Sequence, residues 1–306
     1  MPSKTAKPSR STQSPSPPVP QLLVITIDGP GGVGKSTAAK LLAQRLGLMY
    51  LDTGATYRAL AYAALERKLN PVTDVEQLTA LAHRLALRLQ TVPGGSLRVE
   101  LDGRDISQAI RTEQVSEAAA QLSQHPPVRR AMVELQRALA NRHGVVVEGR
   151  DTGSVVFPHA THKFFLDAHL AVRARRRQRE LAKRYRTQLP LAQVHEQLQF
   201  RDGLDLRRRV GPLVKPAGAL AIDTTHLTTS QVVARMLHHI DVVTSRGDVR
   251  GSCRCATPRV LAAPHYRRRP STRLCLARDD PERSEGRRLR AHGGPRSAPP
   301  PNVTHR

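Results

Sequence analysis

The segment GPGGVGKS, residues 29–36, constrains the fold more than any other part of the chain. It matches the pattern G-x-x-x-x-G-K-[ST] and lies between the compact apolar run LLVITI and the helical pattern KSTAAKLLAQRLG, which stops at Gly47. A strand, a glycine-rich turn and a helix in this order begin a βαβ unit whose turn surrounds phosphate groups. The sequence therefore predicts a nucleoside-triphosphate site in an α/β fold. The structural alternative is a glycine-rich turn that ends in an exposed lysine.

The same motif assigns roles to single residues. Lys35 is expected to pair with oxygens of the β- and γ-phosphates, and the Ser36 hydroxyl to ligate Mg²⁺. The predicted ATP-binding set is Gly29, Pro30, Gly31, Gly32, Val33, Gly34, Lys35, Ser36 and Thr37. The Asn-Lys-x-Asp element that selects guanine does not occur in the sequence, which favours adenine. The motif does not reveal the fate of the γ-phosphate, because GTPases, ATPases and small-molecule kinases share it.

Short apolar runs alternate with helical periodicity from Leu22 to about Ile240. Later strands are predicted at VVVE from Val145, KFFLDA from Lys163 and ALAID from Ala219. This alternation is typical of a mostly parallel sheet covered by helices. Residues 70–130 follow a different pattern. A small antiparallel element with a turn at Asp102-Gly103 is predicted for SLRVELDGRDIS, and a polar helix is predicted for TEQVSEAAAQLSQ. We interpret this region as an insertion that carries a site for a second ligand.

Three charged residues end the run of β-branched residues at Val145. Glu148, Arg150 and Asp151 stand where a buried strand should stop, and such groups are costly there without a partner or ligand. In open α/β sheets, ligands bind at the carboxyl ends of the strands. These charges are therefore candidate site residues, and a structural ion pair is the alternative.

Two further segments carry arginine near predicted element ends. LDTGATYR offers the Thr53 hydroxyl and the Arg58 guanidinium, and RDGLDLRRR places Arg201, Asp205 and Arg208 on one face of a predicted helix. The planar guanidinium suits bidentate contacts to phosphate, so these segments fit a second phosphate-bearing ligand held in line with the first. A solvated basic helix face is the alternative for the second segment.

The net charge of +24 invites a nucleic-acid interpretation, but the charge is unevenly distributed. Residues 245–306 hold fifteen arginines, no lysine and five acidic residues, a net charge of +10, and they also hold all three cysteines. Periodicity vanishes there, so we expect a disordered tail. Electrostatic binding of nucleic acid or membrane, and translation of GC-rich sequence in an unselected frame, are both open for it. An aromatic content of 3% leaves few platforms for stacking on bases.

The other end of the chain is also distinct. Residues 1–21 are basic and rich in serine and proline, which predicts a disordered leader, with an organellar transit peptide as the alternative. The sequence has no apolar run of the roughly 18 residues that a membrane span requires. Because residues 21–244 contain no cysteine, the predicted catalytic part needs no disulfide and fits a reducing cytosol.

Six segments in this order and spacing resemble the bacterial cytidylate kinase family: ITIDGPGGVGKST, YLDTGATYRALA, VELDGRDISQAIRTEQVS, VVEGRDTGSVVFP, KFFLDA and RDGLDLRRRVGPLVKPAGALAIDTT. The resemblance covers about residues 22–240. The donor loop is common to many families, whereas EGRD-x-G-x-VVFP and IRT-x-x-VS are far more specific. The resemblance implies a P-loop kinase fold with a central parallel sheet flanked by helices, an inserted domain for the nucleoside monophosphate (NMP) and a helical lid.

The resemblance also implies direct in-line transfer of the γ-phosphoryl group from ATP, with Mg²⁺, to CMP or dCMP. By position, the acceptor phosphate would be held by Thr53, Arg58, Arg150 and Arg208, the ribose by Arg201 and Asp205, and the cytosine edge by Arg129 and Asp151. An Arg donor and an Asp acceptor can together read that edge. Lys35, Arg150 and Arg208 would be catalytic. The implied protein is a cytoplasmic monomer acting on small molecules.

The implied domains are a leader at 1–21, a kinase domain at 22–244 and a tail at 245–306. The kinase domain includes the NMP-binding insertion at about 70–130 and the lid at about 171–190. The lid helix would span Ala171 to Arg186, with Arg175 or Arg179 reaching the transferred group, and RNA binding is its alternative role. Three positions depart from the family pattern: Ala120 replaces a serine that contacts the base, Gly218 replaces an aspartate, and Glu148 replaces an aspartate found in some members.

Overall fold

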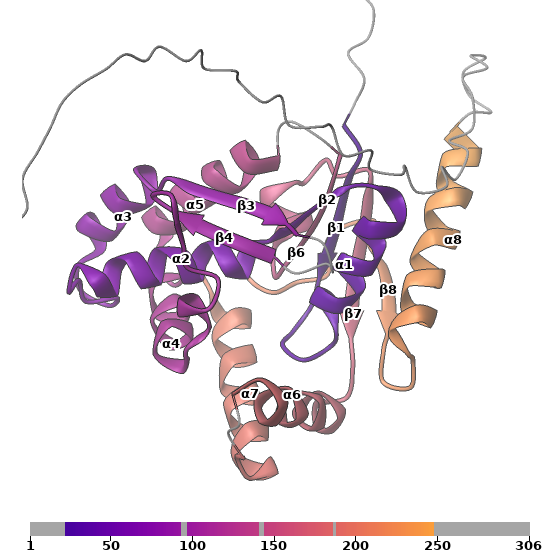
Figure 1. Cartoon of the computed structure of the whole chain (residues 1–306). Helices are drawn as coiled ribbons and strands as arrows, with labels where there is room; N and C mark the ends of the chain where they lie inside the picture. The colour runs from indigo at the N-terminus through magenta and orange to yellow at the C-terminus, as the bar shows by residue number, and fades with distance from the viewer. Residues whose placement is uncertain (1–21, 93–96, 141–143, 186–187, 248–306) are drawn as a thin grey trace, which may run out of the picture. The chain divides into compact units, whose positions relative to one another are not determined.

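The computed structural model describes residues 22–92, 97–140, 144–185 and 188–247 (Figure 1). The predicted leader lies outside the described residues, and so does the predicted tail from residue 248 onward. The last helix, α8 (Thr229–Gly247), continues beyond residue 244, so the domain boundary expected there falls within a helix. Within the described ranges, no helix combines the length and the apolar character needed to cross a bilayer.

The main sheet has five parallel strands in the order β2-β6-β1-β7-β8, which confirms the predicted parallel sheet. The strands are β1 (Val24–Asp28), β2 (Met49–Asp52), β6 (Val145–Gly149), β7 (His162–Asp167) and β8 (Leu220–Asp223). β6 is buried along its whole length, as expected for a central strand covered on both faces. In the register of the sheet, Asp28 lies opposite Gly149, and Asp52 lies opposite Glu148. Four charged or strand-ending residues thus meet at one edge.

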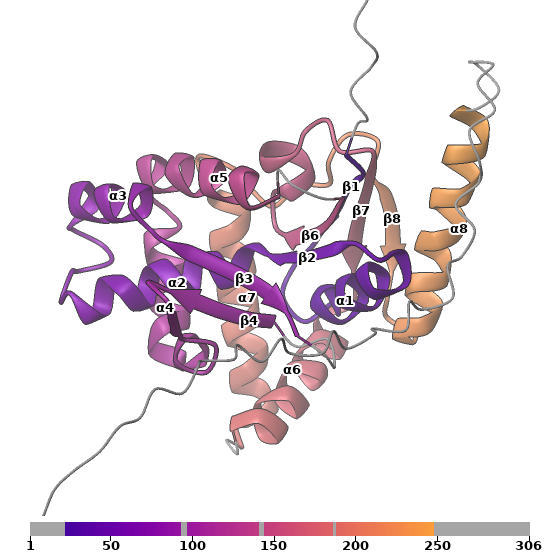
Figure 2. The same cartoon turned by 45° about the horizontal axis from the view of Figure 1, so that its top comes forward.

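Helices cover this sheet. α1 (Lys35–Leu46) begins directly at the donor loop and ends at Gly47, whose left-handed backbone stops the helix. α1 packs on β1, β2 and β6 and lies beside α8, as both views of the fold show (Figures 1 and 2). A π-helical turn, η2 (Thr152–Val156), follows β6 and packs on β1 and on α5 (Pro126–Ala140).

The insertion contains a second, antiparallel sheet in the order β3-β4-β5. β4 (Leu97–Leu101) and β5 (Arg104–Asp105) confirm the predicted antiparallel element, and Asp102 and Gly103 both have positive φ, as a tight two-residue turn requires. β3 (Leu87–Thr91) was not predicted. The region also contains α3 (Val75–His83), η1 (Ala109–Arg111) and α4 (Glu113–Leu122), and α2 (Thr53–Glu66) precedes it.

Two helices pack as a pair beyond the carboxyl edge of the sheet: α6 (Leu170–Tyr185) and α7 (Leu191–Arg207) (Figure 2). They share a small apolar cluster of Ala174, Val194 and Leu198, separate from the main core. The helix predicted over residues 171–186 is observed as α6, and its role as a lid stays a prediction. The expectation that Arg208 lies on a helix face is wrong, because α7 ends at Arg207 and Arg208 has extended backbone. Beyond the helix the chain turns back on it, and the Leu213 backbone N–H donates to the Asp205 carbonyl oxygen at 2.9 Å.

Candidate active site

A cleft of about 1260 Å³ lies at the carboxyl edge of the main sheet. It is lined by the donor loop, the start of α2, the segment after β6, α4 and α7, so the donor and acceptor segments predicted from the sequence open onto one space. This is the edge at which ligands bind in open α/β sheets. Of the predicted ATP-binding residues, Gly31 to Thr37 line the cleft, whereas Gly29 and Pro30 lie behind it.

Backbone geometry explains the glycines of the donor loop. Gly29 has φ of +146°, and a Cβ there would come within 2.1 Å of the Leu166 carbonyl oxygen on β7. Gly32 and Gly34 also have positive φ, which an L side chain adopts only with strain. The loop therefore needs glycine to pass close to β7 and to turn its N–H groups toward the cleft.

Lys35 is buried, and its ammonium donates a hydrogen bond to the Pro30 carbonyl oxygen at 2.7 Å. The pKa of Lys35 is lowered to about 7, chiefly by burial and also by the Arg150 charge, while the charges of Glu148 and Asp28 oppose the shift. The residue that should pair with the phosphates of ATP is thus held in a site where its own charge is costly. Binding of a polyanion would stabilise the charged form of Lys35.

On the acceptor side, one carboxylate joins two arginines. Asp205 accepts a hydrogen bond from Arg150 Nε at 2.8 Å and pairs through its other oxygen with Arg208. Arg150 follows β6, whereas Asp205 lies on α7 and Arg208 just beyond it. Side chains from two elements therefore meet at the cleft. The pairing fixes the guanidinium groups while leaving donors available for an anion.

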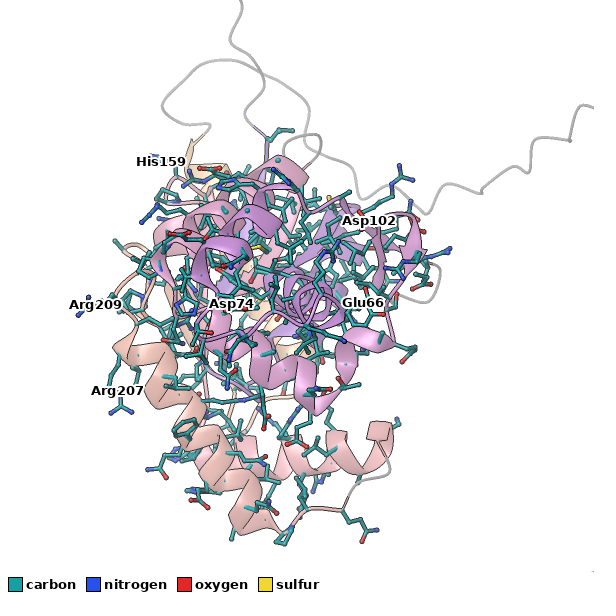
Figure 3. All side chains as sticks on the ribbon, turned by 90° about the vertical axis from the view of Figure 1, so that its left-hand side faces the viewer. Glu66, Asp74, Asp102, His159, Arg207 and Arg209 are labelled. Atoms are coloured by element: carbon teal, nitrogen blue, oxygen red, sulfur yellow. The ribbon has the colours of Figure 1, made fainter. Side chains whose placement is uncertain are left out.

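Only the middle arginine of the Arg207–Arg209 triplet turns into the protein. Arg208 is 8% exposed, whereas Arg207 and Arg209 are exposed and point away from the molecule (Figure 3). Burial lowers the pKa of Arg208, and Asp205 opposes this shift. The triplet is therefore one site residue between two surface residues, which sequence spacing alone could not reveal.

The start of α2 supplies the next predicted pair. Asp52 caps the helix by accepting from the Ala55 backbone N–H at 2.9 Å, and it accepts from Arg58 Nη2 at 3.0 Å. Thr53 is buried and donates its hydroxyl to the Glu148 carbonyl oxygen at 2.8 Å. Gly149 makes this contact possible, because a Cβ there would come within 2.5 Å of Thr53 Oγ1. Both predicted residues line the cleft.

Arg129 and Asp151 form a buried ion pair, so two residues that the sequence placed at one base edge are brought together. Asp151 lines the cleft, whereas Arg129 is 1% exposed and lies behind it, 5.6 Å from the centre of the Tyr57 ring. Arg129 also donates to the Ser123 carbonyl oxygen. The pair presents its acidic member to the cleft.

The remaining sequence assignments fall as follows. Arg201 lines the cleft, and burial lowers its pKa, together with the charges of Arg177 and Arg150. This concentration of positive charge favours an anion. Ala120 also lines the cleft and offers it no hydroxyl group. Gly218 has positive φ and open space where a Cβ would lie.

Sequence reasoning missed several residues that organise the cleft. Asp52 and Asp28 end two strands, and Tyr50 donates its hydroxyl to the Glu148 carboxylate. On α6, the arginines that line the cleft are Arg176 and Arg177, whereas Arg175 and Arg179 are exposed. The available signal for the acidic residues was that parallel strands end in Asp or Glu at the same edge, but their partners could be found only in three dimensions.

The carboxylate of Glu148 interacts with the serine of the donor loop, Ser36. Burial raises the pKa of Glu148, as does Asp52, while Lys35 and a hydrogen bond with Ser36 lower it. A serine hydroxyl next to a carboxylate at the end of a neighbouring strand is the donor set that P-loop proteins use for Mg²⁺. Among the described residues no group of three or more His, Cys, Asp and Glu side chains could hold a metal ion by itself. The Ser36 hydroxyl and the Glu148 carboxylate are the donor types that fit Mg²⁺.

The fold and the site together define a P-loop kinase. Comparison with known proteins narrows the class: residues 25–242 match the profile of the family described as cytidylate kinase. The chain is 44% identical over 217 residues to the cytidylate kinase of Symbiobacterium thermophilum, covering 71% of this chain and 95% of that protein. It is 45% identical over 219 residues to that of Edwardsiella ictaluri, with coverage of 71% and 95%. It is 42% identical over 228 residues to that of Desulfitobacterium hafniense, with coverage of 74% and 97%. The chain belongs to the cytidylate kinase family.

Proposed function

We propose that the chain transfers the γ-phosphoryl group of ATP to CMP or dCMP, giving ADP and CDP or dCDP. The observation that carries this proposal is that the donor loop and the Arg150–Asp205–Arg208 group open onto the same cleft. A kinase needs two phosphate sites facing each other, because phosphoryl transfer depends on positioning and on neutralising charge. Family membership names the acceptor class.

The reaction needs no covalent enzyme intermediate. An oxygen of the CMP phosphate attacks the γ-phosphorus, the bond from that phosphorus to the β–γ bridging oxygen breaks, and ADP leaves with the electron pair. The acceptor oxygen is already a competent nucleophile at neutral pH, so no strong general base is required. Lys35, Arg150 and Arg208 would stabilise the charge on the phosphoryl oxygens.

The acceptor phosphate would be held by Thr53, Arg58, Arg150 and Arg208. Asp205 supports this role because it orients Arg150 and Arg208 before any ligand arrives. Asp52 does the same for Arg58. Arg201 and Asp205 would meet the ribose hydroxyls, one as donor and one as acceptor. Such preorganisation reduces the entropy that binding must overcome.

The cytosine edge would be read by Asp151 and Arg129. A carboxylate can accept from the exocyclic amino group of cytosine, and a guanidinium can donate to the ring nitrogen and carbonyl oxygen. Because Arg129 lies behind Asp151, we propose that Asp151 contacts the amino group. Arg129 would stabilise the charged form of the Asp151 carboxylate and hold its orientation. Uracil presents a carbonyl oxygen at the same position, and two hydrogen-bond acceptors would then face each other without a proton between them.

Mg²⁺ would be held through Ser36, with Glu148 close behind it in the position of the acidic residue that P-loop proteins place at a strand end. When bound, the metal supplies charge neutralisation on the β- and γ-phosphates. Tyr50, by donating to Glu148, holds that carboxylate toward the loop.

The pair α6 and α7 would act as the lid that covers ATP and excludes water. Arg177 lines the cleft, and its side chain pairs with Glu180, whereas Arg176 is tied to Thr224 by two hydrogen bonds. We therefore assign contact with the transferred group to Arg177 rather than to Arg175 or Arg179. Of the domain limits proposed from the sequence, the NMP-binding insertion at about 70–130 is kept, whereas the lid is extended to the end of α7 and the kinase part to the end of α8.

We further infer a monomeric protein that works in the cytoplasm. All the proposed donor and acceptor residues come from one chain, which supports activity without a partner subunit. The cytoplasm is where ATP and nucleoside monophosphates are supplied together. Size-exclusion chromatography with light scattering tests the first inference, and fractionation of the source cells tests the second.

The rival functions are a P-loop kinase for another acceptor and a nucleic-acid-binding protein. ADP formation from MgATP, measured in parallel with CMP, dCMP, UMP, AMP and no acceptor, separates the first rival from the proposal. Turnover restricted to CMP and dCMP supports the proposal, and turnover with a different acceptor refutes it. RNA affinity measured across salt concentrations, with and without residues 248–306, tests the second rival.

A further inference from the structure

Asp28 is a buried carboxylate for which the proposed reaction has so far no role. It is the last residue of β1, directly before the donor loop, and none of its surface is exposed. Its oxygens accept three hydrogen bonds: Oδ1 from the Thr152 backbone N–H at 2.7 Å and from the Thr152 hydroxyl at 2.8 Å, and Oδ2 from the Gly153 backbone N–H at 2.7 Å. All three donors belong to η2, the turn that follows Arg150 and Asp151.

The hydrogen bonds of η2 explain why it needs this carboxylate. Val156 N–H reaches the Asp151 carbonyl oxygen at 3.2 Å, and Phe157 N–H reaches that of Thr152 at 2.7 Å. These bonds span five residues, so the turn is wide, and its first N–H groups have no partner inside it. Asp28 accepts from two of those N–H groups. A buried N–H without a partner would be destabilising, so the carboxylate determines where the turn begins.

Packing around Gly153 shows that the fit is close. A Cβ at this position would come within 2.7 Å of Thr26 Oγ1 and 3.2 Å of Asp28 Oδ2. The far end of the turn is held separately, because Arg137 on α5 donates to the carbonyl oxygens of Val155 and Val156 at 2.9 and 2.8 Å. The turn is thus fixed by a carboxylate at its first residues and by a guanidinium at its last.

Asp28 is therefore the connection between the two substrate segments. Through the backbone it continues into Gly29 and the donor loop, and through its side chain it holds the two residues that follow Asp151. Both oxygens of the Asp28 carboxylate accept hydrogen bonds from η2, so this side chain is committed to that turn. Parallel pairing of β1 with β6 sets the spacing of the strands, but it stops at Gly149. Beyond Gly149, hydrogen bonds to the Asp28 carboxylate hold the chain in place of strand pairing.

We propose that Asp28 is a positioning residue that fixes the segment carrying Arg150 and Asp151 relative to the donor loop, so that the acceptor phosphate meets the γ-phosphate in line. This inference rests on the proposed function. Substitution of Asp28 should disturb the acceptor more than the donor, because the backbone of Gly29 remains held by the sheet while η2 loses its anchor. Misplacement by about 1 Å can lower turnover about a hundredfold.

The test is Asp28→Asn in the full chain. The amide keeps the size of the side chain but places a donor against one of the N–H groups of η2. We expect KM for CMP to rise and kcat to fall, each by about tenfold or more, with KM for ATP within about threefold of the wild-type value. Isothermal titration with CMP alone should show the same loss of affinity. A folded variant whose kcat and whose KM values for CMP and ATP all equal those of the wild type would overturn the inference.

Two further variants separate positioning from general stability. Asp223→Asn is the matched control: Asp223 also ends a strand of this sheet and accepts from a Thr backbone N–H two residues on, at 2.8 Å, but it lies on β8 and is exposed. It should leave both KM values unchanged. Thr152→Val removes the hydrogen bond from the Thr152 hydroxyl to Asp28 and places no new donor against η2. It should raise KM for CMP more than KM for ATP, but by less than Asp28→Asn does. If Asp28→Asn does not fold, this variant decides: an equal rise in both KM values, or none, contradicts positioning.

Failure of the proposed function would look different. In that case the wild-type chain itself would form no CDP, whereas failure of the present inference leaves wild-type turnover intact and removes only the asymmetry between the two KM values. Combining Asp28→Asn with Thr152→Val adds a further check. Because both act through one contact, the double variant should lose less than the two single effects combined, and fully additive losses would argue against the inference.

Discussion

Arg150 Nε donates to Asp205 Oδ2 at 2.8 Å, and this contact joins the carboxyl end of β6 to α7. The other oxygen of Asp205 pairs with Arg208, so one carboxylate holds two arginines of the acceptor site. Of the charges that follow VVVE in the sequence, Arg150 is thereby paired, and we propose that it also binds the acceptor phosphate. A structural ion pair and a phosphate site are not alternatives here, because the pairing leaves guanidinium N–H groups available to a ligand.

Arg150→Ala should lower kcat/KM for CMP by about a hundredfold to a thousandfold, which is the usual effect of removing one donor to the developing charge. The fold should survive, because the Arg150 side chain is about one third exposed and its partner Asp205 keeps Arg208. Steady-state kinetics measure the loss, and circular dichroism checks the fold. Near-normal turnover by a folded variant would refute the assigned role.

The Arg207–Arg209 triplet offers a comparison at neighbouring positions. Arg208→Ala should reduce kcat/KM about a hundredfold or more, because this side chain is buried against Asp205. Arg209→Ala should change activity less than about twofold, since an exposed arginine on the surface contributes little. Equal losses in the two variants would indicate that the net positive charge of the segment, rather than the placed guanidinium, matters.

Asp151→Asn tests base recognition. The selectivity ratio of kcat/KM for CMP over UMP should fall by about tenfold to a hundredfold, the size of losing one hydrogen bond to a charged group. Breaking this buried pair also leaves Arg129 without its counter-charge, at a cost of about 3 kcal/mol or more in unfolding free energy. Kinetics must therefore be measured below the lowered melting temperature. An unchanged ratio would remove Asp151 from the base site.

Lys35 makes ATP binding depend on pH. Because its pKa is lowered to about 7, the side chain is mostly neutral at pH 8 in the free protein, and it must take up a proton to pair with phosphate. Affinity for ATP should fall as pH rises above 7, and binding at pH 8 should take up close to one proton. Calorimetry in two buffers of different ionisation enthalpy measures that uptake. Lys35→Arg, always charged, should show none; the absence of uptake in the wild type would contradict the assignment.

Much of the fold could be predicted because the strands carry unambiguous signals. The β-branched run at Val145 and the loop between β1 and α1 have few alternatives, since a buried parallel strand and a phosphate loop each restrict residue type. β3 escaped prediction because LRLQT is short and half exposed, and its apolar alternation is weak. Its pairing with β4 depends on contacts distant in sequence.

The residue types of the candidate site could be predicted from the sequence, but the contacts between those residues could not. Arginines could be recognised from their positions after strands, yet spacing placed Arg208 on a helix that ends one residue earlier. The buried Asp28 and the partly exposed Asp52 resemble ordinary strand ends in the sequence. Their importance lies in which group they meet: Asp28 accepts from backbone N–H groups of η2, and Asp52 accepts from the Arg58 guanidinium, contacts that only the folded structure reveals.

The most direct measurement is the amount of CDP formed by the full chain from CMP and MgATP, quantified by chromatography together with ADP, with Arg150→Ala and Arg209→Ala assayed alongside. The account predicts CDP and ADP in equal amounts for the wild type and for Arg209→Ala, and a loss of about a hundredfold or more for Arg150→Ala. ADP without CDP, or equal CDP formation by both variants, would contradict it.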